Sequence, residues 1–369
     1  MFFHTSHNGA IRITTGCFTK ETDNGSWTES NSVLSVTDPC LPFNAQAEQV
    51  LLGIDSVAFQ YGNPVFIRFF LSDPANQTEY VKDHLKCNCP VSVIGQAPLD
   101  GSKIAAWVWC RSNATVKKIR DGLHSVSWLG TEEIWYSSGL SGASDSFAQT
   151  VELLDDLSSA LQAHGMTLQD DCVRTWLFVQ NIDVNYKGVV DGRNSVFDRH
   201  GLTCDTHFIA STGIEGRTLN HANKVMLDAV AVKGIGVEQQ YLYGASHLNR
   251  TSEYGVRFER GTVVRYPDFK HVFISGTASI GNKGQVMYPG DIVRQTGRMI
   301  ENVEVLLAES GCSFNDVPAI TVYLRDPSDY AVVKQILAER FPEHPLIVTL
   351  APVCRPGWLI EMECVAISC

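Results

Sequence analysis

Three stretches of this chain repeat one helical pattern: QAEQVLLGIDSVAFQYG (46–62), QTVELLDDLSSALQAHG (149–165) and QTGRMIENVEVLLAESG (295–311). Each stretch opens with Gln, closes with Gly sixteen residues later, and carries apolar residues at helical spacing in between. The closing Gly is typical of a residue in the left-handed conformation at the end of a helix. The pattern therefore predicts one supersecondary unit used three times.

The repeat continues after each helix. A first apolar run follows, as VFIRFFLSD (65–73), VRTWLFVQNID (173–183) and AITVYLRD (319–326). A second helical stretch comes next, and each copy ends in another apolar run, KIAAWVWC (103–110), KVMLDAVA (224–231) and LIEMECVA (359–366). Helices that alternate with runs rich in β-branched and aromatic residues predict an α/β (α+β) fold.

The repeat length divides the chain into residues 1–115, 116–240 and 241–369. We expect each unit to be a mixed sheet covered on one face by two helices. A sheet with one covered face must bury the other, so three such sheets can meet around a common centre. The first unit is the most degenerate copy.

Composition limits the partners. The formal net charge of −11 disfavours a nucleic-acid partner, which needs clustered Lys and Arg. No apolar run is long enough for a membrane span, and the start of the chain lacks the features of a signal peptide. Eleven irregularly spaced cysteines fit reduced thiols in the cytoplasm. The C-N-C of Cys87 and Cys89 is not a zinc spacing, and the sequence has no P-loop or dinucleotide fingerprint, so we expect neither metal nor cofactor.

The third unit resembles the Rid family, also called YjgF/YER057c/UK114. The resemblance rests on HVFISGTASIG (271–281), the helix at 295–311, ITVYLRD (320–326) and LIEMECVAI (359–367). It implies single units that form homotrimers with ligand clefts between adjacent subunits. This chain therefore resembles a fused Rid pseudo-trimer. We expect one chain to form the whole assembly, and the sequence leaves higher assembly open.

Within that superfamily, the chain resembles the chorismatases, long chains that end in a Rid-like domain. The matching segments occur in the same order: TWLFVQNID with DGRNSVF (191–197), STGIEG (211–216), YGVRFERG (254–261), SGTASI (275–280) and VCRPGWLIEME (353–363). Ordered agreement of several short segments is more specific than any one of them. The resemblance implies a cytoplasmic enzyme that acts on a small carboxylate and needs no cofactor.

The three copies differ chemically. Rid enzymes that hydrolyse imines use a Glu early in the last strand, which corresponds to Glu361 here and to Ala105 and Met226 in the other units. The resemblance places their carboxylate-binding Arg at Leu346, and a Tyr near the start of the unit at Phe258. Both departures weaken the deaminase interpretation. Only the third unit is expected to carry an active site.

The residues themselves suggest acid chemistry. Strand alternation places Glu361 and Glu363 on one face, where two desolvated carboxylates would raise one pKa and keep a proton available. Glu361 is the candidate general acid; a polar strand face is the alternative interpretation. Arginines bind carboxylates with a bidentate fork. Further candidates for substrate binding fall in the matched segments: Arg355, Arg257, Arg260, Arg193, Phe258, Ser275, Gly276, Gly213, Cys354 and Glu363.

Three functions remain open at this point. The first is a chorismatase-like enzyme that protonates and hydrolyses an enolpyruvyl ether and releases pyruvate, with Glu361 as the acid. The second is an enamine or imine deaminase of the Rid type. The third is a protein that binds a ligand in its clefts without turnover. The acidic balance disfavours the ribonuclease role that the family name carries.

Overall fold

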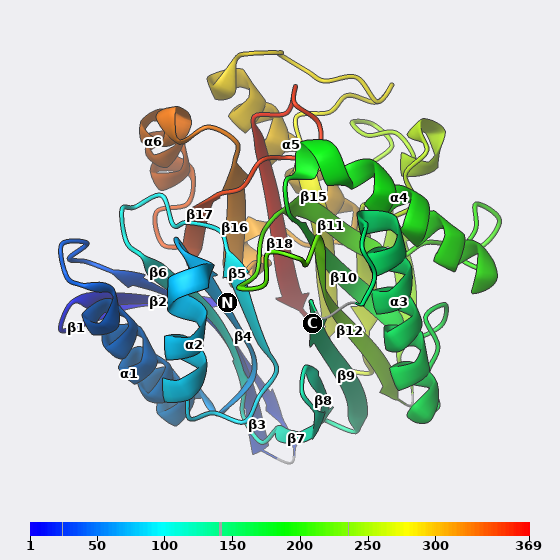
Figure 1. Ribbon diagram of the computed structural model, residues 1–369. Helices are drawn as coiled ribbons and strands as arrows, with labels where there is room; N and C mark the ends of the chain where they lie inside the picture. The colour runs from blue at the N-terminus through cyan, green and yellow to red at the C-terminus, as the bar shows by residue number, and fades with distance from the viewer. Residues whose placement is uncertain (24, 140–141, 235) are drawn as a thin grey trace.

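The computed structural model describes residues 1–23, 25–139, 142–234 and 236–369, and contains three six-stranded mixed sheets (Figure 1). The first sheet and its helices comprise β1 (Phe2–Asn8), β2 (Ile11–Thr22), β3 (Gly25–Val36), α1 (Phe43–Tyr61), β4 (Asn63–Leu71), α2 (Pro74–His84), β5 (Val91–Gly95) and β6 (Ile104–Arg111). Its strand order is β1-β2-β3-β6-β4-β5.

The second and third sheets repeat this architecture. The second comprises β7 (Thr115–Arg120), β8 (Leu123–Trp128), β9 (Thr131–Ser138), α3 (Ser146–Ala163), β10 (Cys172–Val179), α4 (Ile182–Arg199), β11 (Ala210–Glu215) and β12 (Val225–Gly234). The third comprises β13 (Glu238–Leu242), β14 (Gly261–Arg265), β15 (Lys270–Ala278), α5 (Ile292–Glu309), β16 (Ala319–Leu324), α6 (Tyr330–Arg340), β17 (Leu346–Leu350) and β18 (Ile360–Ser368). The expected fold class is thereby confirmed.

The strand pairing relates the three sheets residue by residue. Each sheet has one parallel pair at its edge, β4–β5, β10–β11 or β16–β17, and its other pairs are antiparallel. Within the last strands, Ala105 pairs with Phe70, Met226 with Phe178 and Glu361 with Tyr323. These pairs occupy the same place in each sheet, so the alignment of Glu361 with Ala105 and Met226 is correct.

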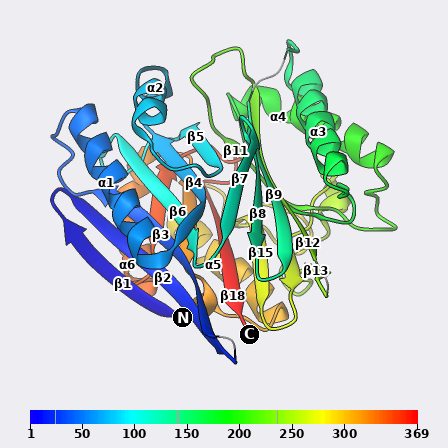
Figure 2. The ribbon, with the colours of Figure 1, turned by 90° about the horizontal axis from the view of Figure 1, so that it is seen from below.

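The sheets meet at a common centre while the helices lie outside (Figure 2). One buried apolar cluster contains residues of all three sheets, among them Trp109, Trp135 and Phe273. Burying these faces against each other removes the apolar surface that a single sheet would expose. The expectation of a shared core is confirmed.

Buried charges at this centre join the units, and we call them the central network. Arg111 donates to Glu29 (2.8 Å) and Glu133 (2.7 Å), and His271 of the third unit contacts Glu29 at 3.0 Å. A second group contains Arg68, which donates to Asp228 (2.8 Å), and Arg174, which donates to Glu363 (2.7 Å). Each of these arginines has a carboxylate partner, which offsets the cost of burying its charge.

The repeated Gln explains why the helix pattern recurs. Gln46, Gln149 and Gln295 are buried, and each side-chain oxygen accepts from the backbone N–H just before the last strand. The donors are Lys103 (2.8 Å), Lys224 (2.7 Å) and Leu359 (3.0 Å). The helix thereby fixes where the last strand begins in each unit.

The closing glycines follow the prediction in two cases of three. Gly165 (φ 66°) and Gly311 (φ 76°) have the positive φ expected just beyond a helix. Gly62 also has a positive φ, of 107°, but its ψ of −165° lies outside the left-handed region. The expectation was wrong there because β4 starts at the next residue, so the chain turns directly into an extended strand.

Candidate active site

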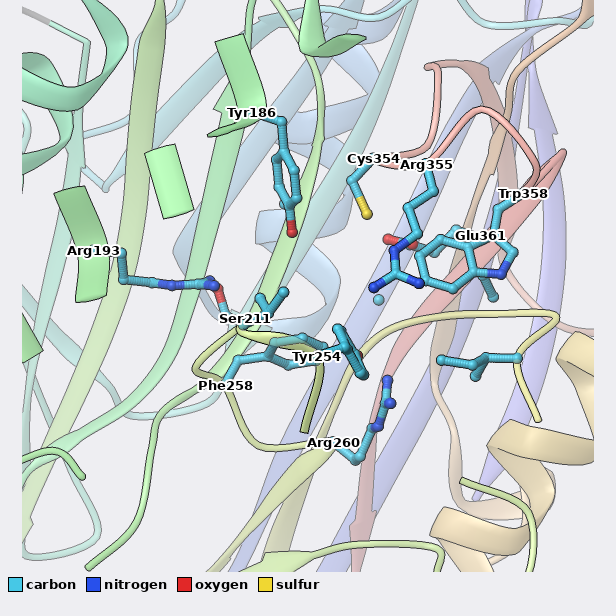
Figure 3. Close-up of a pocket in the computed structure, with 15 residues that line it drawn as sticks. Tyr186, Arg193, Ser211, Tyr254, Phe258, Arg260, Cys354, Arg355, Trp358 and Glu361 are labelled. Atoms are coloured by element: carbon cyan, nitrogen blue, oxygen red, sulfur yellow. The ribbon is translucent and has the colours of Figure 1, made fainter. Parts of the chain in front are cut away.

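A cleft lies where the second and third units meet, and we call it the Glu361 cleft (Figure 3). Two isolated bridges, Ala210 to Glu259 and Ile214 to Val353, hold β11 against the third unit beside it. The cleft has an empty volume of about 500 Å³, which includes space open to solvent. Its walls are Tyr186, Arg193, Ser211, Gly213, Tyr254, Val256, Phe258, Arg260, Gly276, Ala278, Ile280, Cys354, Arg355, Trp358 and Glu361.

Glu361 lies near the start of β18, immediately beyond the contact between Gln295 and the backbone of Leu359. Its side chain is buried, with the residue only 4% exposed. Burial raises the pKa of Glu361 from 4.5 to about 8, with a further upward effect of Glu363. Arg174 and Arg260 oppose the shift. The carboxyl is therefore mainly protonated at neutral pH and can act as a proton donor.

A β-bulge opens space for this carboxyl. Pairing between β15 and β18 shifts between Ile274 and Thr277, so that two residues of β15 oppose one of β18. One of them, Gly276, lies against Glu361: a β-carbon at position 276 would lie 2.1 Å from Oε1 of that residue. The absent side chain thus makes room for the acid. The corresponding pairings of β3 and β9 show no such shift.

Three guanidinium groups surround the cleft. Arg193, on α4, is 3% exposed and hydrogen-bonds to Tyr186, while its Nε and Nη2 have no hydrogen-bond partner. Arg260 is 4% exposed and donates to the backbone oxygen of Asn249. Arg355 packs its guanidinium over two aromatic rings. None of the three forms a salt bridge with a carboxylate in the part of the chain that the structure describes.

Polar groups without charge complete the site. Tyr186 is hydrogen-bonded to the Cys354 thiol, and burial raises the pKa of Tyr186 well above its usual value. Burial also raises the pKa of Cys354 to about 12, so at neutral pH the thiol remains protonated. Figure 3 shows Tyr186, Cys354, Arg193 and Arg260 pointing toward one space from different sides. A polar ligand in this space could therefore contact polar side chains on several of its sides.

The structure brings most of the sequence candidates together. Glu361 shares the cleft with Arg355, Arg260, Arg193, Phe258, Gly276, Gly213 and Cys354. The sequence interpretation missed Tyr186, Ser211, Tyr254 and Trp358 as wall residues. Tyr186 lies seven residues before Arg193 on α4, and this spacing of two helical turns is the signal that could have revealed it.

Three candidates lie outside the walls of the cleft. Arg257 forms a salt bridge with Asp198 and is partly exposed. The Ser275 hydroxyl donates to the backbone oxygen of Glu259 (2.6 Å) and accepts from the N–H of Ser211 (2.9 Å). It thus joins the second unit to the third. Glu363 belongs to the central network, where Arg174 is its partner, although its charge still acts on Glu361.

Leu346, where the resemblance places the Rid arginine, lies outside the Glu361 cleft. Leu346 begins β17, pairs with Ile320 and faces the first unit rather than the Glu361 cleft. In the second unit the same place in the sheet is occupied by Ser211, which pairs with Thr175 and lines the Glu361 cleft. Since each cleft is built by two neighbouring units, the relevant comparison is with Ser211. The usual arginine is absent there too.

The comparisons with known proteins agree with this architecture. The family model described as Endoribonuclease L-PSP matches residues 263–368. A RutC family protein of Pyrococcus abyssi is 38% identical over 97 residues, which cover 26% of this chain and 76% of that protein. This chain belongs to the Rid family. The 3-aminoacrylate deaminase RutC of Acinetobacter baylyi is 32% identical over 97 residues, 26% of this chain and 77% of that enzyme.

A solved structure relates the rest of the chain to a known fold. A chorismatase crystal structure superimposes with a TM-score of 0.67 at 19% identity, and covers 82% of this chain and 93% of that one. The Rid-family match covers only the third unit, whereas this likeness extends over most of the molecule. At that identity it establishes a shared fold.

Two further properties concern the described residues. None of their helices is long and apolar enough to cross a membrane. No group of three or more His, Cys, Asp and Glu side chains among them is arranged to hold a metal ion.

Proposed function

We propose that this Rid-family protein hydrolyses a small enolpyruvyl ether that carries two carboxylates, as chorismate does, with Glu361 as the general acid. The fold shared with a chorismatase supports the proposal. The chemistry of the cleft supports it independently, and the charges of the wall residues carry most of the argument.

The deciding observation is that three guanidinium groups without carboxylate partners surround one protonated carboxyl. Arg193, Arg260 and Arg355 give the cleft three positive charges, and a protonated Glu361 contributes none. Burying unpaired cations is costly unless an anion joins them. A ligand with two carboxylates would supply two negative charges. Its oxygens would accept hydrogen bonds from the free N–H groups of Arg193.

The reaction then follows from the position of the proton. Glu361 donates it to the terminal methylene carbon of the enol ether, which becomes a methyl group and leaves an oxocarbenium ion at the ether carbon. Water adds to that carbon, and the resulting hemiketal collapses to pyruvate and the alcohol. The proton released from water restores Glu361. While Glu361 is ionised, the nearby Arg260 stabilises its charge.

Chorismate incubation tests this proposal, with pyruvate release followed by reduction to lactate. We expect release by the wild type and a rate about a thousandfold lower in Glu361→Gln, since a general acid contributes rate factors of this order. Glu132→Gln, which changes an exposed carboxyl on β9, serves as the matched control. Absence of pyruvate release by the wild type would refute the proposed activity.

A Rid-type deaminase is the second candidate, supported by the similarity to the Acinetobacter RutC. The buried Glu361 could serve hydrolysis of an enamine or imine as well. This alternative requires one arginine for one carboxylate, and leaves two guanidinium groups unused. Ammonia release from 2-aminoacrylate or 3-aminoacrylate, without pyruvate release from chorismate, would favour it. Binding without any turnover would favour a ligand-binding protein.

We also propose that a single chain is the working unit and that it acts in the cytoplasm. The Glu361 cleft is assembled from two units of one chain, so no second copy is needed to build it. The net charge of −11 disfavours nucleic acid as a partner. The expected partner is the small carboxylate alone, without a cofactor.

A further inference from the structure

A second cleft lies between the first and third units, and we call it the Arg12 cleft. Its empty volume is about 1240 Å³, more than twice that of the Glu361 cleft. An isolated bridge from Pro98 to Thr349 holds the two units together beside it. Its walls are Thr5, His7, Arg12, Thr14, Val33, Ser35, Pro98, Asp100, Tyr330, Lys334, Leu337, Ala338, Phe341, Pro342, His344, Leu346, Ile347 and Val348.

The strand register shows that the two clefts are counterparts. Leu346 and Val348 of β17 take the places that Ser211 and Gly213 of β11 take in the Glu361 cleft. Ser35 pairs with Ala105, as Ala278 pairs with Glu361. The Arg12 cleft therefore has the same construction, but an alanine stands where the acid would be.

The floor of the Arg12 cleft is apolar and its rim is basic. Val33, Leu337 and Phe341 are buried along the floor. Arg12 and Lys334 are exposed at the rim, and neither has a carboxylate partner within the described residues. Asp100 is the only acidic wall residue. In a protein of net charge −11, this local excess of cations favours an anion with an apolar body.

His344 adds a polar group of a different kind. Its Nε2 lies 2.9 Å from the backbone oxygen of Phe314 and must carry the proton, because a carbonyl oxygen only accepts. Burial lowers the pKa of His344, so the ring is neutral at neutral pH and Nδ1 keeps a lone pair. That buried Nδ1 has no hydrogen-bond partner. A hydroxyl group could donate to it.

We propose that the Arg12 cleft is a second, non-catalytic binding site for a small hydroxylated aromatic or cyclic carboxylate. Arg12 and Lys334 bind the carboxylate, the apolar floor receives the ring, and His344 accepts from the hydroxyl. Since Ala105 replaces the acid, the ligand leaves the site unchanged. None of these ligand contacts involves a residue of the Glu361 cleft, so binding here does not depend on the function proposed for that cleft.

Calorimetric titration with 3-hydroxybenzoate tests the proposal. Charge reversal in Arg12→Glu/Lys334→Glu removes the carboxylate contacts, and Ala338→Trp fills the cleft from an exposed helix position without changing charge. Lys86→Glu/Lys117→Glu is the matched control, because both lysines are exposed and neither lines a cleft. Arg193→Met identifies any binding that belongs to the Glu361 cleft.

We expect Arg193→Met and the lysine control to bind one equivalent of 3-hydroxybenzoate. In both Arg12-cleft variants the dissociation constant of that equivalent should rise about tenfold or more. The turnover of the Glu361 cleft should remain unchanged in those variants. Wild-type affinity in both Arg12-cleft variants would overturn the proposal. So would the absence of binding by the wild type, or a single equivalent lost in Arg193→Met and kept in Arg12→Glu/Lys334→Glu.

Discussion

Buried arginines in two regions of this molecule differ in whether they have a carboxylate partner. In the central network Arg68, Arg111 and Arg174 each have a carboxylate partner within 2.8 Å. In the Glu361 cleft Arg193 and Arg260 are buried almost as deeply and have none among the described residues. At the centre, carboxylates of the chain neutralise the arginines. In the cleft, the arginines lack such partners and could be neutralised by an anionic ligand.

The difference separates residues that maintain the fold from residues that bind. A paired arginine at the centre stabilises the junction of the three units, because its charge is already neutralised by a carboxylate of the chain. An unpaired arginine in a cleft lowers the stability of the empty protein and raises its affinity for an anion. Burial alone would have placed both sets in one class. The presence or absence of a carboxylate partner distinguishes them.

The largest expected effect concerns stability. Arg111→Met leaves Glu29 and Glu133 buried without their guanidinium, and should lower the free energy of unfolding by about 3–5 kcal/mol. Arg193→Met removes a buried cation that has no carboxylate partner, and should change the same quantity by about 1 kcal/mol or less, or raise it. Urea unfolding measures both. Equal losses in the two variants would contradict the distinction.

For ligand affinity, unlike stability, the cleft arginines should matter more than the central ones. Arg193→Lys keeps a positive charge but loses the planar fork, so the dissociation constant for a dicarboxylate should rise about tenfold to a hundredfold. Arg257→Lys is the control, since Arg257 lies outside the walls of the cleft and pairs with Asp198. Fluorescence or calorimetric titration gives both constants. An equal effect at the two positions would remove Arg193 from the binding site.

The pH dependence tests the state of Glu361. Its pKa rises from 4.5 to about 8 on folding, so the folded protein holds a proton that the unfolded chain releases between these values. Stability from this group is therefore lost as pH rises through that window, by about 1.4 kcal/mol per pH unit. Glu361→Gln should lack this slope in unfolding experiments repeated across pH.

Turnover should follow the same titration. The proton-donating form of Glu361 disappears above its pKa of about 8, and kcat/KM should then fall about tenfold per pH unit. The profile below that value should be flat down to the next titrating group. A rate that increased as pH rose through 8 would show that Glu361 acts as a base rather than an acid.

The smallest effect is expected at Cys354. With a pKa raised to about 12, its thiol is not ionised at neutral pH and is a poor nucleophile. Cys354→Ser keeps a hydrogen-bonding group beside Tyr186, so kcat/KM should remain within about threefold of the wild type. Steady-state kinetics measures this. A loss of about a hundredfold would instead indicate covalent catalysis by Cys354.

The fold was predictable because its signals are local. The spacing from Gln46 to Gly62 and its two repeats lies within one helix, and the alternating runs lie within single strands. The site was predictable only in part. Arg260 lines the cleft while Arg257, three residues earlier, turns to Asp198, and the difference depends on the path of the loop before β14.

Other features depend on contacts between units. Glu363 has the same strand parity as Glu361, but its partner Arg174 belongs to a different unit and draws it into the centre. Ser211, which has the place in the second sheet that Leu346 has in the third, was recognised as a wall residue only when β11 was seen to form the other wall of the cleft. Such relations join residues more than a hundred positions apart, and no spacing pattern within one unit carries them.

The covalent joining of the three units changes how the protein can evolve. In a symmetric trimer of identical subunits, one altered codon appears three times, so a substitution that costs about 1 kcal/mol per subunit costs about three in the assembly. In this chain, each position is altered once. Glu361 can therefore stand in one unit while Ala105 and Met226 stand at the corresponding positions of the other two. Fusion thus permits the clefts between the units to differ in their residues, as the Glu361 cleft and the Arg12 cleft do.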